Sequence, residues 1–386
     1  MKFIISRPQL AEAVKNAAKV APPFSNMEAI KNILIECDES TSEVYLTATN
    51  NEASVKIKTS ALTGSQGGAA AINGRLLDRM LPLLTGDYVV ISAETSSTLT
   101  ITSGNTVFKI NCIPAHDYPK PEIAGAGENA AISGVCTLNR KTTRFLSESS
   151  AKPALQCVNV KMSGSKVNAT ASDSFKMIFI KGAGESKGSV EFLMPGRALN
   201  MLAAMSEDSD MFNVSDNGSQ LIFDRGDITF AARKLTNEKY LDTASLIKNL
   251  NTAYSAITET RELKEALETA SVSSRAGKNF KPVNLVVANN EITITCENDH
   301  SEARVAMPAS VSSSTPPGGF WYDPSPLLQA IRLFNGKAKL EIDARGTLII
   351  KTSNEVYFQA PFRPPIPASS EAGTTHGSAP ETAKAA

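Results

Sequence analysis

Pairs of basic residues spaced four positions apart are the strongest chemical signal in this sequence. Three pairs occur in segments where apolar residues recur at helical spacing: Lys15 with Lys19, Arg75 with Arg79, and Arg140 with Arg144. Because residues four apart lie on the same face of an α-helix, each pair places two cations side by side. Such a face would suit the phosphate backbone of a nucleic acid, which Lys and Arg bind without reading the base sequence.

Further basic residues occur in the corresponding segments along the chain: Lys141, Arg197, Arg261, Lys264 and Arg332. A solvated helix face stabilised by charge pairs is the alternative to a nucleic-acid surface. The last part of the chain supports that alternative, because Glu262, Glu265 and Glu268 accompany its basic residues.

The charge balance of the whole chain leaves both interpretations open. Its 39 Lys and Arg residues equal its 39 Asp and Glu residues, so the formal net charge is zero. This balance argues against a nucleic-acid protein that is basic throughout. It is compatible with basic helices set on a shell that is otherwise neutral or acidic.

Residue patterns that support catalysis or metal binding are weak. The chain has no GxxxxGK[ST] phosphate loop and no GxSxG nucleophile elbow. The 3 histidines lie far apart, and the 5 cysteines form no CxxC pair. We therefore expect no catalytic residue, no metal and no cofactor. An enzyme that uses an acidic residue such as Asp173 in a cleft between domains stays open as an alternative.

Three similar stretches indicate that the chain contains three copies of one unit. Residues 44–50, 166–173 and 291–298 are strand-like runs that end in a turn signal, and they lie roughly 122 to 128 residues apart. An aromatic mark also recurs at a similar spacing, as Val107-Phe108, Thr229-Phe230 and Tyr357-Phe358. A repeat this long is a whole domain rather than a solenoid unit.

The 386 residues are therefore expected to form three domains and a tail. The expected boundaries are 1–125, 126–250 and 251–364, followed by a disordered tail at 365–386 that is rich in Pro, Ala, Ser, Thr and Gly. Glycine-rich and polar joints near 122–130 and 248–253 separate the copies.

Each copy is expected to have an α+β composition, with two helices and about eight strands. Periodicity predicts first helices at 7–20, 139–149 and 261–272, each after a strand at 3–5, 133–137 or 255–258. Second helices are predicted at 74–81, 196–205 and 325–334, the last two with a proline at or just before their start.

Bulk composition is that of an ordinary globular protein. The sequence has no run of eighteen apolar residues that would span a membrane, and the apolar stretch at its N-terminus is too short for a signal peptide. Scattered cysteines without a pairing pattern are typical of a reducing compartment. We expect a cytoplasmic protein without membrane contact.

Apolar residues near the joint of the second and third copies suggest a peptide-binding groove. Leu155, the segment 172–177, Leu241, Leu246 and the segment 361–363 could meet there. Packing within the core or between domains is the alternative explanation for each of them.

An ordered set of short motifs resembles the bacterial DNA polymerase III β subunit, the sliding clamp. The motifs that carry the resemblance are Met1-Lys2-Phe3, Asn32-Ile33-Leu34, Ile113–Pro119, Ser172–Met177 and Ala360–Arg363. They run in the right order and spacing from Met1 to about Pro364. No motif is decisive alone, but the ordered set is specific.

The resemblance implies three sliding-clamp domains and a head-to-tail homodimer that forms a closed ring. Helices would line the hole and sheets the outside, so that double-stranded DNA passes through without base readout. The clamp would have no active site of its own and would tether the replicative polymerase α subunit. The residues expected to face the DNA are Lys15, Lys19, Arg75, Arg79, Arg140, Lys141, Arg144, Arg197, Arg261, Lys264 and Arg332.

The resemblance also implies a pocket between the second and third domains for short peptides of the polymerase, the clamp loader and other partners. Its expected residues are Leu155, Ser172, Ser174, Phe175, Lys176, Met177, Leu241, Leu246, Pro361, Phe362 and Arg363. The expected dimer interface joins Phe108 and Ile110 of one copy to Val272 and its neighbours of the other.

This chain departs from the family pattern at the pocket and in one loop. Ser174-Phe175-Lys176 stands where the family usually has Gly-His-Arg, and the usual proline near Leu241 and arginine near Ser245 are absent. The loop 21–26 lacks the basic residue often placed there. A divergent clamp paralogue that binds DNA and partners outside replication is therefore an alternative.

Overall fold

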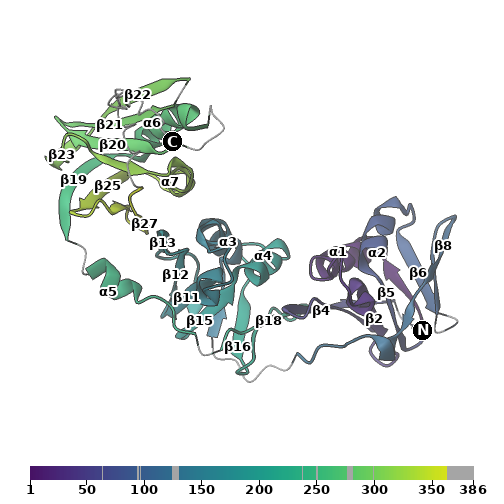
Figure 1. Ribbon diagram of the computed structural model, residues 1–386. Helices are drawn as coiled ribbons and strands as arrows, with labels where there is room; N and C mark the ends of the chain where they lie inside the picture. The colour runs from purple at the N-terminus through teal and green to yellow at the C-terminus, as the bar shows by residue number, and fades with distance from the viewer. Residues whose placement is uncertain are drawn as a thin grey trace, which may run out of the picture.

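Three units of similar architecture follow one another along a curve in the computed structural model (Figure 1). The structure describes residues 1–362 except 63, 94, 96, 124–129, 237, 249–250, 276–280 and 299. Arg363, which we predicted to line a pocket, and the predicted tail at 365–386 lie outside the described residues. The proposed domain boundaries stay predictions. Among the described residues, none of the helices combines the length and hydropathy that a membrane-spanning segment requires.

The first unit alternates two helices with antiparallel strands. Its elements are β1 (Lys2–Ser6), α1 (Arg7–Ala18), β2 (Asn32–Cys37), β3 (Glu43–Thr49), β4 (Ala53–Ser60), β5 (Gly68–Asn73), α2 (Gly74–Met80), β6 (Tyr88–Ala93), β7 (Thr98–Ser103), β8 (Thr106–Asn111) and β9 (Ile113–Pro114). Short 3₁₀ turns, η1 (Glu28–Lys31) and η2 (Leu81–Leu83), connect some of them.

The second unit repeats this order and ends in a linker helix. Its elements are β10 (Ala130–Ile132), α3 (Val135–Thr142), β11 (Cys157–Ser163), β12 (Lys166–Ser172), β13 (Lys176–Ile180), β14 (Ser186–Lys187), β15 (Val190–Pro195), α4 (Gly196–Ala204), β16 (Phe212–Asp216), β17 (Gln220–Asp224), β18 (Ile228–Arg233) and α5 (Thr243–Lys248). The 3₁₀ turn η5 spans Pro153–Gln156.

The third unit completes the repeat. Its elements are β19 (Thr252–Glu259), α6 (Thr260–Arg275), β20 (Val283–Ala288), β21 (Glu291–Glu297), β22 (Glu302–Pro308), β23 (Ser310–Ser313), β24 (Phe320–Tyr322), α7 (Pro324–Ile331), β25 (Lys337–Asp343), β26 (Leu348–Lys351) and β27 (Glu355–Gln359).

Helical periodicity explains why the first helix of each unit forms where it does. Leu10, Val14 and Ala17 are fully buried on one side of α1, and Leu263 and Leu267 occupy the matching positions of α6. Each first helix packs beside the second helix of its unit, as α1 with α2, α3 with α4, and α6 with α7. Figure 1 shows these helix pairs on the inner side of the curve and the sheets outside.

The second unit corrects one prediction. The strand expected at 133–137 is wrong, because the strand β10 ends at Ile132 and α3 already begins at Val135. Gly134 separates them in the left-handed region, at φ 75°, where an added Cβ would meet the carbonyl oxygen of Ala183 at 2.5 Å. The helix therefore starts four residues before the predicted position 139, and it ends at Thr142 rather than at the predicted position 149.

Two of the sheets run without a break from one unit into the next. The strand order β14-β10-β16-β17-β18-β4-β3-β2-β5-β9 joins the first two units through β18 and β4. The order β15-β11-β12-β13-β27-β26-β25-β19-β23 joins the last two through β13 and β27. The remaining sheets, β1-β6-β7-β8 and β22-β21-β20-β24, leave β8 and β22 as edge strands at the two ends of the curve (Figure 1).

Candidate functional site

Basic side chains of the first two units lie on the exposed side of the inner helices. Lys15 of α1, Arg75 and Arg79 of α2, and Arg140 at the end of α3 are exposed, and Arg144 follows in the next turn. Within the described part of the chain, these five cations form no ion pair with a carboxylate. Within the described residues, no carboxylate therefore neutralises these five charges.

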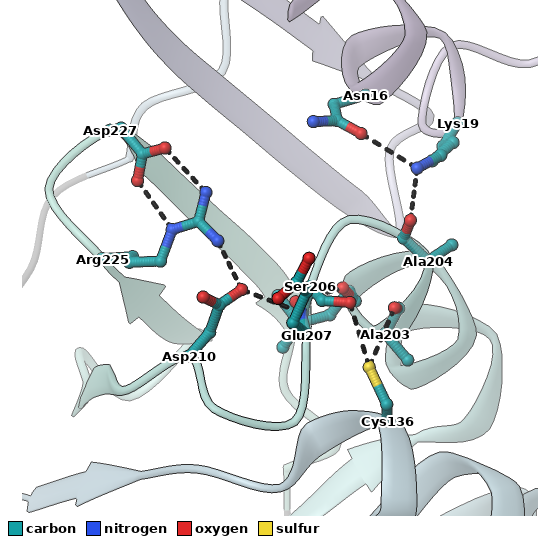
Figure 2. A network of polar contacts seen from close by, with 11 residues as sticks. Asn16, Lys19, Cys136, Ala203, Ala204, Ser206, Glu207, Asp210, Arg225 and Asp227 are labelled. Atoms are coloured by element: carbon teal, nitrogen blue, oxygen red, sulfur yellow. Dashed lines mark hydrogen bonds and ion pairs between the residues drawn. The ribbon is translucent and has the colours of Figure 1, made fainter. Parts of the chain in front are cut away.

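Lys19 points to the joint of the first two units instead. Figure 2 shows its ammonium group between Asn16 and Ala204, and Nζ donates to Asn16 Oδ1 at 2.9 Å and to the carbonyl oxygen of Ala204. Burial, and then the nearby charge of Lys15, lower the pKa of Lys19. Since Ala204 ends α4, the cation stabilises the negative end of that helix dipole and ties the two units together.

Arg225 forms ion pairs in the cleft beside this contact (Figure 2). Arg225 donates from Nε and Nη2 to the two carboxylate oxygens of Asp227, each at 2.7 Å, and also pairs with Asp210. The hydrogen bond from Arg225 holds the pKa of Asp227 below its ordinary value. The cleft has a volume of about 720 Å³ and carries both signs of charge, with Lys15 and Glu207 also in its wall. It is not a simple phosphate site.

In contrast to those five cations, four other residues that we predicted to face DNA have carboxylate partners. Lys141 Nζ lies 2.7 Å from Glu355 Oε1 across the joint of the second and third units. The remaining pairs are Arg197 with Glu52 at 3.8 Å, Arg261 with Glu265 at 4.0 Å and Arg332 with Glu268 at 2.8 Å. The inner helices of the third unit are thus closer to neutral than those of the first two, and a DNA role for these residues stays a prediction.

The outer face of the sheet differs in chemistry between the two joints. At the first joint Ser54 lies opposite Ala231, and Lys56 lies opposite Thr229. At the second joint the outward side chains are apolar. They are Met177 and Phe179 of β13, Ile349 of β26, and Val356 and Phe358 of β27, and Ile247 of α5 packs on them. This difference explains why a groove for apolar peptide side chains would form at the second joint rather than the first.

The predicted pocket residues divide into a buried set and an exposed set, and the exposed set is called the rim below. Leu155, Ser172 and Met177 are buried, while Pro361 is exposed and Lys176 partly buried. The exposed fractions of the large apolar side chains are 75% for Phe175, 41% for Leu241, 47% for Leu246 and 47% for Phe362. These four exposed apolar side chains are candidates for a surface that a partner covers.

Trp321 is a residue of this rim that the sequence did not indicate. The backbone N–H of Phe362 donates to its carbonyl oxygen at 2.6 Å, which fixes Phe362 beside β24. Nearby, burial raises the pKa of the Asp323 carboxyl group. The backbone carbonyl oxygen of Asp323 accepts a hydrogen bond from Gln359 Nε2 at 2.9 Å. The strand β24 and the end of β27 thus form one wall of the joint.

The turn 173–176 places Phe175 at the surface. Asp173 Oδ1 accepts from the backbone N–H groups of Phe175 at 2.9 Å and Lys176 at 2.8 Å, and Oδ2 pairs with Lys176 Nζ at 2.5 Å. Ser174 has φ 85°, a left-handed conformation that costs an L-residue energy and that glycine adopts freely. This conformation gives a physical reason for glycine in the usual family pattern of this turn.

Replacing Ser174 by Gly should therefore stabilise the chain by about 0.5–1 kcal/mol, since it removes strain at a positive φ. The measurement is the free energy of unfolding in urea. Ser165→Gly is the matched control, because Ser165 is also an exposed turn serine of the second unit and does not have a positive φ. A loss of stability in both variants would contradict the assigned strain.

The predicted interface residues lie at the two ends of the curve, in the edge strand β8 and in α6 beside the edge strand β22. In β8, Phe108 is partly buried and Ile110 is 7% exposed, whereas Val107 is 57% exposed. Val272 of α6 and Leu83 of η2 are each 71% exposed, although both are apolar. Apolar side chains left open beside unpaired strands are typical of a surface that another chain covers.

Evidence for a metal centre is lacking in the part of the chain that the structure describes. These residues contain no group of three or more His, Cys, Asp or Glu side chains close enough to hold a metal ion. Asp173, considered above as a catalytic acid, is instead occupied by the turn hydrogen bonds and by Lys176.

Comparisons with known proteins agree with this architecture. Residues 1–122 match the family model described as DNA polymerase III beta subunit, N-terminal domain. The β sliding clamp of Bacillus subtilis (strain 168) is 24% identical over 375 residues, which cover 92% of this chain and 97% of that protein. The resemblance to the bacterial DNA polymerase III β subunit is confirmed.

Solved structures confirm the fold. The DNA polymerase sliding clamp from Bacillus subtilis superposes with a TM-score of 0.85 at 22% identity, covering 94% of this chain and 99% of that chain. A putative DNA polymerase III beta subunit from Eubacterium rectale superposes with a TM-score of 0.84 at 15% identity, with the same coverage of 94% and 99%. The predicted α+β fold of sliding-clamp domains is therefore correct.

Proposed function

We propose that this chain, which has the fold of the β sliding clamps, closes with a second copy into a head-to-tail ring around duplex DNA. The observation that carries the proposal is the continuity of the sheets. Inside the chain, β18 pairs with β4 and β27 pairs with β13. By sheet order, β8 is the counterpart of β18 and β27, and β22 is the counterpart of β4 and β13. The edge strands β8 and β22, which lack within the described chain the partner that their counterparts have, are thus a matching pair.

The internal joints predict the register of the joint between copies. Phe230 lies opposite Val55 at the first joint, and Tyr357 lies opposite Ile178 at the second. The corresponding positions on the edge strands are Phe108 of β8 and Ala303 of β22. The correspondence follows from the residue that each one lies opposite on the neighbouring strand of its own sheet, β7 for Phe108 and β21 for Ala303. In an antiparallel pair Lys109 would then lie opposite Glu302, two charges of opposite sign.

Helix contacts at the first joint predict a second contact between copies. Lys19 at the end of α1 meets Ala204 at the end of α4. Val272 has the position of Lys19 in the third unit, and η2 follows α2 where Ala204 ends α4. The proposed contact is therefore between Val272 of one copy and Leu83 of the other, and it would bury two side chains that are each 71% exposed.

The proposed DNA surface is the inner side of the ring. The unpaired cations Lys15, Arg75, Arg79, Arg140 and Arg144 of each copy would contact phosphates without base readout, as a mobile ring requires. On this proposal the protein is a cytoplasmic processivity factor without an active site of its own. It raises the effective concentration of the replicative polymerase α subunit at the primer end.

The proposed docking site for the polymerase, the clamp loader and other partners is the exposed apolar rim at the second joint. An extended peptide would place apolar side chains among Phe175, Leu241, Leu246 and Phe362. Phe362→Ala should weaken binding of the polymerase α subunit and of the clamp loader by about tenfold or more, since aromatic anchors dominate such interfaces. The measurement is the affinity of each partner for the immobilised full chain.

Leu62→Ala is the matched control for that experiment. Leu62 is 47% exposed, the same fraction as Phe362, but it follows β4 in the first unit. Equal affinity of both partners for the parent chain and for Phe362→Ala would refute the docking site. Loss of affinity in both variants would also refute it, because the effect would not be local.

The altered turn keeps a second candidate function open, a clamp paralogue that acts outside replication. In the turn that contains Ser174, Phe175 adds an aromatic side chain to the rim, and Lys176 is paired with Asp173. A ring that encloses DNA but does not stimulate its own replicative polymerase would favour this candidate.

A further inference from the structure

We propose that Phe24 and Arg75 form a platform on which an unpaired DNA base stacks. The inference rests on the proposed function, because it needs DNA on the inner side of the first unit. Phe24 lies in the loop between α1 and β2 and is 80% exposed, a larger fraction than for any other exposed large apolar side chain of the described residues. Water contact over a whole ring face is unfavourable unless a partner covers the ring.

The loop presents this ring from a fixed position. Val20 before the loop is 1% exposed and Ile30 after it is 4% exposed, so both ends are anchored in the core. Within the loop, the hydroxyl of Ser25 accepts from the backbone N–H of Met27 at 3.1 Å. The aromatic side chain is therefore held out from an ordered turn.

A cation accompanies the ring. The guanidinium carbon of Arg75 lies 5.8 Å from the ring centroid of Phe24, a cation–π contact. Arg75 is in the first turn of α2, and Arg79 lies one turn further along the same face. In the loop itself, the carboxylate of Glu28 is paired with Lys31 at 2.5 Å. The platform thus combines a stacking surface with positive charge, which matches a nucleotide rather than an apolar peptide.

An unpaired base suits this platform better than a base pair. In a duplex the faces of the bases are covered by their neighbours, so an aromatic side chain can stack only where pairing ends. Stacking on an aromatic ring accepts every base, because each has a π face. A polymerase substrate offers such a base at the junction of primer and template, and each ring would carry two platforms.

The experiment compares two DNA probes on the full-length protein. One is a blunt duplex, and the other is the same duplex with a single-stranded template overhang that carries 2-aminopurine at its first unpaired position. We expect the parent to bind the overhang probe about tenfold more tightly than the blunt probe and to quench the 2-aminopurine fluorescence. Phe24→Ala should abolish both effects, and Phe24→Trp should retain them.

Phe175→Ala is the control, because Phe175 is 75% exposed but lies at the second joint. Equal preference and quenching in the parent and in Phe24→Ala would overturn the platform while leaving the ring proposal intact. A parent that binds neither probe would also overturn the platform, and it would leave the ring proposal intact, because a ring slides off short DNA with free ends. Unchanged binding of the blunt duplex by Phe24→Ala, at an unchanged melting temperature, would show that the ring itself is preserved.

Discussion

Replacing Lys109 by Glu is expected to split the ring into single chains at micromolar concentration. In the register that the internal joints predict, residue 109 of β8 lies opposite Glu302 of the other copy. The substitution would set two carboxylates against each other, at both interfaces of the ring. Like charges that face each other across a pair of strands are destabilising, and like charges juxtaposed at an interface cost several kcal/mol. The measurement is the molar mass by light scattering over a range of concentrations.

The reverse substitution gives the test its specificity. Glu302→Lys alone should also produce single chains, and the double variant that carries both substitutions should restore the mass of two chains. Lys161→Glu is a suitable control, because Lys161 is exposed on the outer sheet of the second unit. If both single variants dissociate and the double variant also stays a single chain, the predicted register is wrong, even if β8 and β22 are the strands that pair.

Replacing Lys141 by Met should have the largest effect on stability among the basic residues considered. Its partner Glu355 has a side chain only 10% exposed, and that of Lys141 is 21% exposed. Removing the cation leaves a buried carboxylate whose remaining partner is the hydroxyl of Thr352, at 2.6 Å. We expect a loss of about 3 kcal/mol in the free energy of unfolding.

Two further variants separate this effect from a general loss of charge. Adding Glu355→Gln to Lys141→Met should recover much of the stability, since no unpaired buried charge remains. Lys161→Met should cost less than about 1 kcal/mol, because its pair with Glu191 is at 3.4 Å between side chains that are 63% and 52% exposed. Equal losses for Lys141→Met and Lys161→Met would contradict the assigned burial. All unfolding free energies are measured in urea.

Local patterns predicted most helices and strands. The spacing of Leu10, Val14 and Ala17 was sufficient for α1, and the strand-like runs predicted at 44–50, 166–173 and 291–298 are the strands β3, β12 and β21. The start of α3 was missed because Gly134 precedes the helix in a left-handed conformation. The spacing of apolar residues does not predict such a backbone conformation. The linker helix α5 was missed because few of its side chains pack on the sheet.

The candidate sites depend on contacts that local patterns do not contain. Arg140 and Lys141 are neighbours in sequence, yet Arg140 is exposed while Lys141 binds Glu355, which lies 214 residues further along. Lys19 appeared to be half of a basic pair, but its partner Ala204 lies 185 residues away. The sequence shows which side chains are basic. Which of them face solvent and which bind a residue of another unit depends on how the units join.

Topological linkage to DNA is the central claim, and one measurement tests it most directly. The protein is loaded onto a nicked circular plasmid by its clamp loader with ATP, and retention is followed by gel filtration before and after a single restriction cut. We predict that the protein stays with the circle and is released from the linear form, because a ring slides off free ends. Equal retention on circular and linear DNA would contradict the ring.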